Sequence, residues 1–150
     1  ICASPTRSCR MGSKAGPSGV NTIDYVTTST LGNASDFGDL STLNSNGGQC
    51  ANAVRGLLGG AAPNIATIEY ITIATLGNSI DFGDLTVGRY YMSACASPTR
   101  GVWLAGWTPT RVNTMDYVQI MSAGNAIDFG DAFIAANATT SGMSNGHGGL

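Results

Sequence analysis

Short strands in which hydrophobic and polar residues alternate follow one another along the chain, and one of these strands recurs three times. It reads T-I-D-Y-V at 22–26, T-I-E-Y-I at 67–71 and T-M-D-Y-V at 114–118. Successive side chains of a strand point to opposite faces, so the tyrosine lies on one face and the acidic residue on the other. Both faces also carry Ile, Val or Met. We therefore expect other sheets to cover both faces.

A second segment, G-N-x-x-D-F-G-D, follows each of these strands at 32–39, 77–84 and 124–131. The spacing is best measured on Tyr25, Tyr70 and Tyr117, which lie 45 and then 47 residues apart. This period is typical of arrays with one supersecondary unit per repeat. Gly and Asn both tolerate positive φ, so we expect them to form a turn, with the phenylalanine anchoring the next strand.

A third repeated segment begins with a cysteine and leads through a turn to an arginine and a short apolar run closed by glycine. Its copies span 2–12, 50–60 and 95–106. Each unit thus contains four short strands without helical periodicity, a pattern typical of a propeller blade. We predict one all-β repeat array over residues 1–150, with approximate repeats at 7–54, 55–99 and 100–146. Partial repeats stand at both ends, the last at Ser144–Leu150.

The overall composition narrows the classes of partner. Charged residues make up 11% of the chain and hydrophobic residues 43%, which is not typical of a disordered chain. A net charge of −2 gives no basic surface for nucleic acid. No apolar run reaches the roughly 18 residues needed to span a membrane. We expect neither a nucleic-acid nor a membrane partner.

Three of the four cysteines, Cys2, Cys50 and Cys95, occupy the same repeat position. Equivalent atoms of neighbouring units normally lie beyond the roughly 7 Å between Cα atoms that a disulfide allows. We interpret these cysteines as small buried thiols, and a bridge between Cys2 and the off-pattern Cys9 is the less favoured alternative. The chain has no C-x-x-C pair and one histidine, so zinc is not expected.

The order of arginine strand, tyrosine strand and aromatic strand resembles the kelch-type β-propeller repeat. It departs from that repeat at Phe37, Phe82 and Phe129, where kelch repeats favour tryptophan, and at Gly12 and Gly106, where a glycine pair is expected. The N-T-I-D-Y-V and G-N-A-x-D-F-G-D segments look more like arrays in structural proteins of tailed bacteriophages, including tail-fibre-like proteins. The resemblance implies kelch-like β-propeller blades in a virion.

All nine acidic residues fall on three repeat positions, whereas an active site needs an asymmetric group of residues. We therefore interpret the acids of the G-N-x-x-D position, Asp36, Asp81 and Asp128, as structural. They are expected to accept hydrogen bonds from turn amides or to pair with the repeated arginines, which are Arg7, Arg55 and Arg100. A calcium site at the D-x-x-D spacing is a minor alternative, because the spacing lacks other ligands of a calcium loop. No cofactor is expected.

Function in a repeat protein is expected where the repeats differ. The proline-containing loops carry Arg10, Lys14, Trp107 and Arg111, and Trp beside Arg suits contact with a sugar or a protein. We predict a non-enzymatic structural protein of a phage virion: a tail fibre, a tail or a capsid-decorating component. Its loops would contact other virion proteins or a host-surface glycan. The alternative is a lectin-like or enzymatic propeller domain with its ligand in the central channel.

Three blades cannot close a ring, because propellers typically have 4–8 blades. We therefore expect these residues to be part of a longer polypeptide with blades before Ile1, or to complete a ring with further copies of the chain. Two chains would then supply six blades.

Overall fold

The computed structural model describes residues 1–15 and 18–136, and in this part of the chain every regular element is a β-strand, as predicted. Twelve strands form three antiparallel sheets, and each sheet consists of four consecutive strands. Sheet 1 contains β1 (Cys2–Ala3), β2 (Arg7–Ala15), β3 (Ser18–Thr27) and β4 (Ser35–Asn44). Sheet 2 contains β5 (Gly48–Ala51), β6 (Arg55–Ala61), β7 (Ile65–Thr72) and β8 (Ile80–Asp84). Sheet 3 contains β9 (Ser93–Ala96), β10 (Arg100–Trp107), β11 (Arg111–Gln119) and β12 (Ile127–Asp131).

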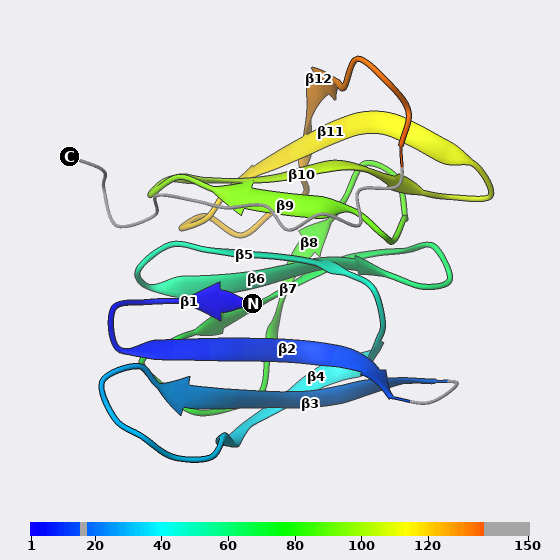
Figure 1. Ribbon diagram of the computed structural model, residues 1–150. Coiled ribbons are helices and arrows are strands. Elements are labelled where there is room, and N and C mark those ends of the chain that lie inside the picture. The colour runs from blue at the N-terminus through cyan, green and yellow to red at the C-terminus, as the bar shows by residue number, and fades with distance from the viewer. Residues whose placement is uncertain (16–17, 137–150) are drawn as a thin grey trace.

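The three sheets lie one upon another, with sheet 2 in the middle (Figure 1). The strand that contains the repeated cysteine is the first strand of each sheet, and β5 contacts both β1 and β9. The prediction of three four-stranded units is thus confirmed. A closed ring of sheets is not present in the described residues.

The interface between sheets 1 and 2 is built from the alternating faces that the sequence pattern predicted. Ile23 lies on the face of sheet 1 that meets sheet 2, and Tyr25 packs at the margin of that core. From the other side, Ile71 and Ile73 of sheet 2 face sheet 1. The tyrosine and the residue after it therefore belong to two different interfaces, which is why both faces of this strand are apolar.

The interface between sheets 2 and 3 repeats this arrangement and adds one large side chain. Leu57 and Ile68 of sheet 2 meet Val118 and Ile120 of sheet 3. Trp103 lies fully buried between the two sheets, and its indole N–H donates a 3.0 Å hydrogen bond to the carbonyl of Gly48. It is the principal apolar group at this interface.

The Gly-Asn segment does not make the turn that was expected of it. The turn after each tyrosine strand is made by the residues just before Gly-Asn, with hydrogen bonds such as Thr75 N–H to Thr72 O at 3.0 Å. In sheets 2 and 3, Gly-Asn comes after this turn and lies against the preceding sheet. The expectation from the local turn preference was therefore wrong, because contacts to another repeat determine the position of these two residues.

Candidate functional site

The repeated arginine, tyrosine and phenylalanine form a stack in each sheet. The guanidinium carbons of Arg7, Arg55 and Arg100 lie 4.8, 4.4 and 5.1 Å from the ring centres of Tyr25, Tyr70 and Tyr117. Each tyrosine ring also meets a phenylalanine edge-on, with ring centres 5.7 to 5.9 Å apart; the phenylalanines are Phe37, Phe82 and Phe129. Such cation–π and edge-to-face contacts stabilise by about 0.5–1.5 kcal/mol each.

The arginines also join neighbouring sheets. Nη1 of Arg7 donates a 2.9 Å hydrogen bond to the carbonyl of Ile73, and Nη1 of Arg55 donates a 3.0 Å hydrogen bond to the carbonyl of Ile120. Each of these two arginines thus holds the backbone of the following sheet. These contacts occupy the guanidinium groups that were expected to pair with carboxylates.

The structure places Asp36, Asp81 and Asp128 in strands β4, β8 and β12 and not in turns. In the described residues no ion pair joins one of these acids to a repeated arginine. Asp128 accepts a backbone N–H within its own strand, β12, since its carboxylate binds Gly130 N–H at 3.0 Å. The guanidinium groups of the repeated arginines instead contact the tyrosine rings and the backbone carbonyls described above.

A latch of hydrogen bonds joins each F-G-D segment to the Gly-Asn of the next repeat. The N–H of Gly77 donates to the carbonyl of Phe37 at 2.9 Å, and the side-chain amide oxygen of Asn78 accepts from the N–H of Asp39 at 3.0 Å. The same bonds, at 2.7 and 3.1 Å, join sheets 2 and 3 through Gly124, Phe82, Asn125 and Asp84. The repeated motif is therefore a device for attaching one sheet to the next.

The glycine of F-G-D is required by this close approach. A Cβ on Gly38 would lie 2.4 Å from the carbonyl oxygen of Gly77, and one on Gly83 would lie 2.5 Å from that of Gly124. Real Cβ atoms do not come so close to backbone atoms, and both glycines also have positive φ. The sequence repeats this glycine because the neighbouring backbone takes the space of a side chain.

We expect Gly83→Ala to lower the free energy of unfolding more than Gly130→Ala. Both glycines have positive φ, so both variants bear the roughly 1–2 kcal/mol backbone cost of an alanine there. Gly130 has no described heavy atom within 4 Å of an added Cβ, whereas Gly83 meets the next sheet. Urea denaturation of dilute protein gives the difference. Equal losses would show that the latch does not depend on this close contact.

A second connection uses the acid of the tyrosine strand. The carboxylate of Glu69 accepts hydrogen bonds from the N–H and hydroxyl of Ser41 in sheet 1. Asp116 in turn accepts the N–H and the hydroxyl of Thr86, at 3.2 and 2.6 Å. The acid of these two repeats therefore binds the segment that follows the F-G-D of the preceding repeat.

Between sheets 2 and 3 this acid has a charged partner as well. The guanidinium of Arg89 lies 2.7 Å from the carboxylate of Asp116, and both side chains are fully buried. Arg89 also donates to the carbonyl of Ala105 at 2.9 Å. In sheet 1 the equivalent acid, Asp24, pairs with Arg10 on the surface. Comparison of the repeats does not point to Arg89, because no other repeat has an arginine there.

The structure separates the four candidate loop residues into two groups. Arg10 and Lys14 lie on β2 and line one groove of about 330 Å³, together with Asn44 and Asn46 from the end of β4 and the segment after it. Trp107 and Arg111 lie opposite each other in the β10–β11 ladder of sheet 3. Trp107 is half-buried and exchanges backbone hydrogen bonds with Tyr90. The four residues do not form one common site.

The buried thiols of Cys2 and Cys50 are poorly suited to act as nucleophiles. Burial raises the pKa of the Cys2 thiol to about 12 and raises the pKa of Cys50 well above its ordinary value, so both stay protonated near neutral pH. All four cysteines are free thiols, including Cys2 and Cys9, which lie opposite each other in the β1–β2 ladder.

A metal centre is likewise not found in the described part of the chain. Within residues 1–15 and 18–136, no three His, Cys, Asp or Glu side chains gather closely enough to hold a metal ion. His147 and the repeat end at Ser144–Leu150 lie outside the described residues.

Comparison with known proteins does not supply a family for this chain. No family model matches it, and no curated protein matches it. The part of the chain that the structure describes also contains no helix long and apolar enough to cross a membrane.

Proposed function

We propose that this chain is a non-enzymatic structural protein of a phage virion, located in a tail fibre, a tail or a capsid decoration. In this proposal the three sheets are kelch-like propeller blades that form a rigid platform. The hairpins between the second and third strands of the sheets would contact other virion proteins. The phage part of the proposal derives from the resemblance of the repeated segments.

The observation that best supports a structural role is that the repeated polar side chains form hydrogen bonds between neighbouring sheets. The arginine of a repeat binds a carbonyl of the following sheet, as Arg55 does with Ile120. The asparagine and the acid bind backbone of the preceding sheet, as Asn125 and Asp116 do. These groups are the ones that an enzyme would use for chemistry, and here they hold the sheets together.

The proposal is tested by protein mass spectrometry on phage particles purified by density gradient. Trypsin is expected to release the fragment 101–111, G-V-W-L-A-G-W-T-P-T-R, which ends at Arg111 and contains both tryptophans. We expect this peptide to follow the particle peak in a fixed ratio to other particle proteins. A peptide found in the lysate but absent from washed particles would overturn the assignment to a virion.

A glycan-binding role is the second candidate, and the groove beside Arg10 favours it. Its lining includes Lys14, Asn44 and Asn46, whose polar groups suit the hydroxyls of a sugar. Binding on a glycan array that is lost in Lys14→Ala would support this role, with Arg111→Ala in sheet 3 as the matched control. Turnover of the bound glycan would indicate an enzyme instead.

A further inference from the structure

Half of a latch lies open on sheet 3. Its F-G-D segment is Phe129–Asp131, which no later repeat covers among the described residues. Phe129 is 49% exposed, whereas Phe37 and Phe82 are 3% and 2% exposed at the same position of sheets 1 and 2. In sheets 1 and 2 the backbone of F-G-D forms hydrogen bonds with the Gly-Asn of the next repeat. The same backbone in sheet 3 is therefore accessible.

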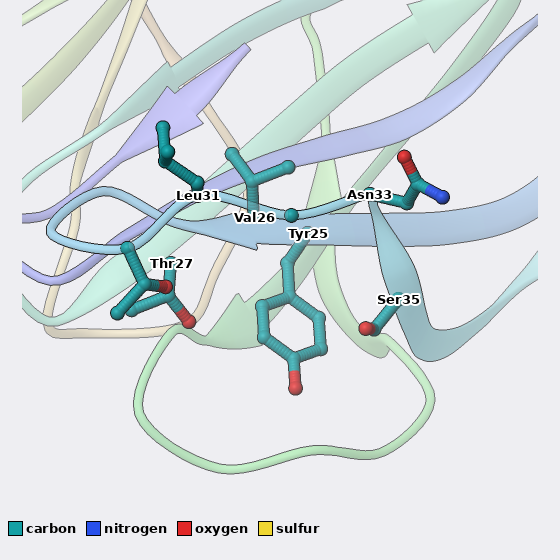
Figure 2. A pocket seen from close by; sticks show the side chains of 8 residues that line it. Tyr25, Val26, Thr27, Leu31, Asn33 and Ser35 are labelled. Atoms are coloured by element: carbon teal, nitrogen blue, oxygen red, sulfur yellow. The ribbon is translucent and has the colours of Figure 1, made fainter.

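The other half of a latch lies open on sheet 1. Its Gly-Asn is Gly32–Asn33, and Asn33 is exposed, with no hydrogen bond of its amide within the described residues. In Figure 2 the side chains of Val26, Leu31 and Asn33 extend away from the side to which Tyr25 points. This side of β3 is the one that meets the preceding sheet in the later repeats, where Ile71 and Val118 are buried.

Sheets 1 and 2 have equivalent pockets beside their tyrosines, and the two pockets differ in one lining residue. The pocket beside Tyr70 is lined by Leu76, Gly77 and Asn78 of sheet 2 and by Phe37 of sheet 1. The pocket beside Tyr25, of about 200 Å³, has the matching residues of sheet 1 but no phenylalanine from another sheet (Figure 2). An exposed phenylalanine at one end of the stack thus corresponds to a pocket that lacks one at the other end.

We propose that a second copy of this chain docks between these ends. The Gly32–Asn33 segment of one copy binds the Phe129–Asp131 edge of the other with the hydrogen bonds of the internal latches. Phe129 then lines the pocket beside Tyr25, as Phe37 lines the pocket beside Tyr70. The contact is heterologous because two different surfaces meet in it. When each of two copies binds the other through both of its ends, the two copies close a ring of six sheets. Six lies within the usual range of 4–8 blades.

The charges at the two ends are compatible with this contact. Asp24 occupies the position of Glu69 and Asp116, which bind the preceding sheet. Its partner Arg10 neutralises it, as Arg89 neutralises the buried Asp116. Burial of Asp24 between copies therefore does not leave an unpaired charge.

The outer face of sheet 1 is also more polar than the corresponding internal face. It has Ser8, Arg10 and Thr28 where sheet 2 has Gly56, Leu58 and Ile73. Less apolar area is then removed from water, so the contact between copies is weaker than the contact between sheets of one copy. We expect the association to be reversible on dilution.

The reactivity of Cys95 shows directly whether a second copy covers the open face of sheet 3. Its equivalents Cys2 and Cys50 are buried where the next sheet covers them, against Gly56 and Gly101. Cys95 lies at the same position of sheet 3 and is half-buried. We expect a thiol reagent to modify Cys95 first in dilute protein. We expect this modification to slow as the protein concentration rises and a second copy covers the face.

Sedimentation equilibrium of the purified protein tests the proposal. We expect the mass to rise from 15.3 kDa to twice that value with concentration. Asn33→Ala removes one hydrogen bond from each of the two contacts of the ring, and roughly a thirtyfold weaker association is expected. Gly130→Ala places a methyl group where the second copy's backbone would lie and should abolish association. Asn78→Ala is the matched control: it breaks an internal latch, lowers stability and leaves association unchanged.

Three results would overturn the proposal. The first is a monomer at all concentrations with Cys95 reactive throughout. The second is a monomer with Cys95 protected at all concentrations, which would indicate that residues of the same chain cover this face. The third is a dimer that Asn33→Ala and Gly130→Ala do not weaken, which would place the contact elsewhere.

Discussion

Replacing Arg89 by methionine is expected to lower the free energy of unfolding by about 3–5 kcal/mol, the usual cost of leaving one member of a buried ion pair alone. The side chains of Arg89 and Asp116 are both fully buried. Methionine retains much of the length of the side chain but none of its donors. The carboxylate of Asp116 would keep its hydrogen bonds to Thr86 and lose its charged partner.

Urea denaturation followed by circular dichroism measures this loss, and the chain supplies a matched control. Arg10→Met removes the partner of Asp24, but Arg10 is 49% exposed, and a surface pair contributes about 0–1 kcal/mol. The double variant Arg89→Met with Asp116→Leu should recover much of the lost stability, because no buried charge then remains. If Arg89→Met and Arg10→Met cost the same, the buried pair does not stabilise the interface between sheets 2 and 3.

Trp103→Ala is the second substitution with a large expected effect, about 3–5 kcal/mol. The indole is fully buried and rests on two glycines of sheet 2, where a Cβ on Gly48 or Gly59 would lie 2.7 Å from the ring. Removal of the ring leaves a cavity between two sheets and takes the indole donor away from the carbonyl of Gly48. The loss reflects both the missing apolar contact and the missing 3.0 Å hydrogen bond.

Trp107→Ala serves as the control for this prediction. Trp107 is half-buried at the end of β10 and takes part in backbone hydrogen bonds that an alanine retains. We expect a clearly smaller loss of stability for Trp107→Ala than for Trp103→Ala. Unfolding of both variants is followed by circular dichroism, because each substitution removes a tryptophan fluorophore. A Trp107→Ala loss as large as that of Trp103→Ala would contradict the assignment of the buried ring as the main anchor.

The sequence allowed the strands and their faces to be predicted, because they depend on local alternation that occurs three times. Ile23 and Ile71 could be assigned to opposite faces from period-two patterning alone. The role of Gly-Asn could not be predicted in the same way. Its partners lie about one repeat away along the chain, and within its own repeat the pair also satisfies the preference for a turn.

Arg89 and the role of Trp103 as the main anchor between sheets 2 and 3 were missed for a different reason. Arg89 and Trp103 each occur in one repeat, so comparison of the repeats gave no reason to select them. The close packing of the Trp103 indole depends on two glycines of another sheet, Gly48 and Gly59, which leave room for the ring. The arginine stacks were missed because charge pairing was expected, whereas the guanidinium groups lie over the tyrosine rings.

The latches connect each sheet to its immediate neighbour and to no other, and this has a consequence for how such a chain can change in evolution. Duplication or deletion of one whole repeat keeps every F-G-D next to a Gly-Asn, as Phe82 is next to Gly124, so no new contact has to arise. Insertion of part of a repeat would separate these partners. Genes for this kind of chain should therefore vary in length by whole repeats, while changes within a repeat concentrate in the hairpins.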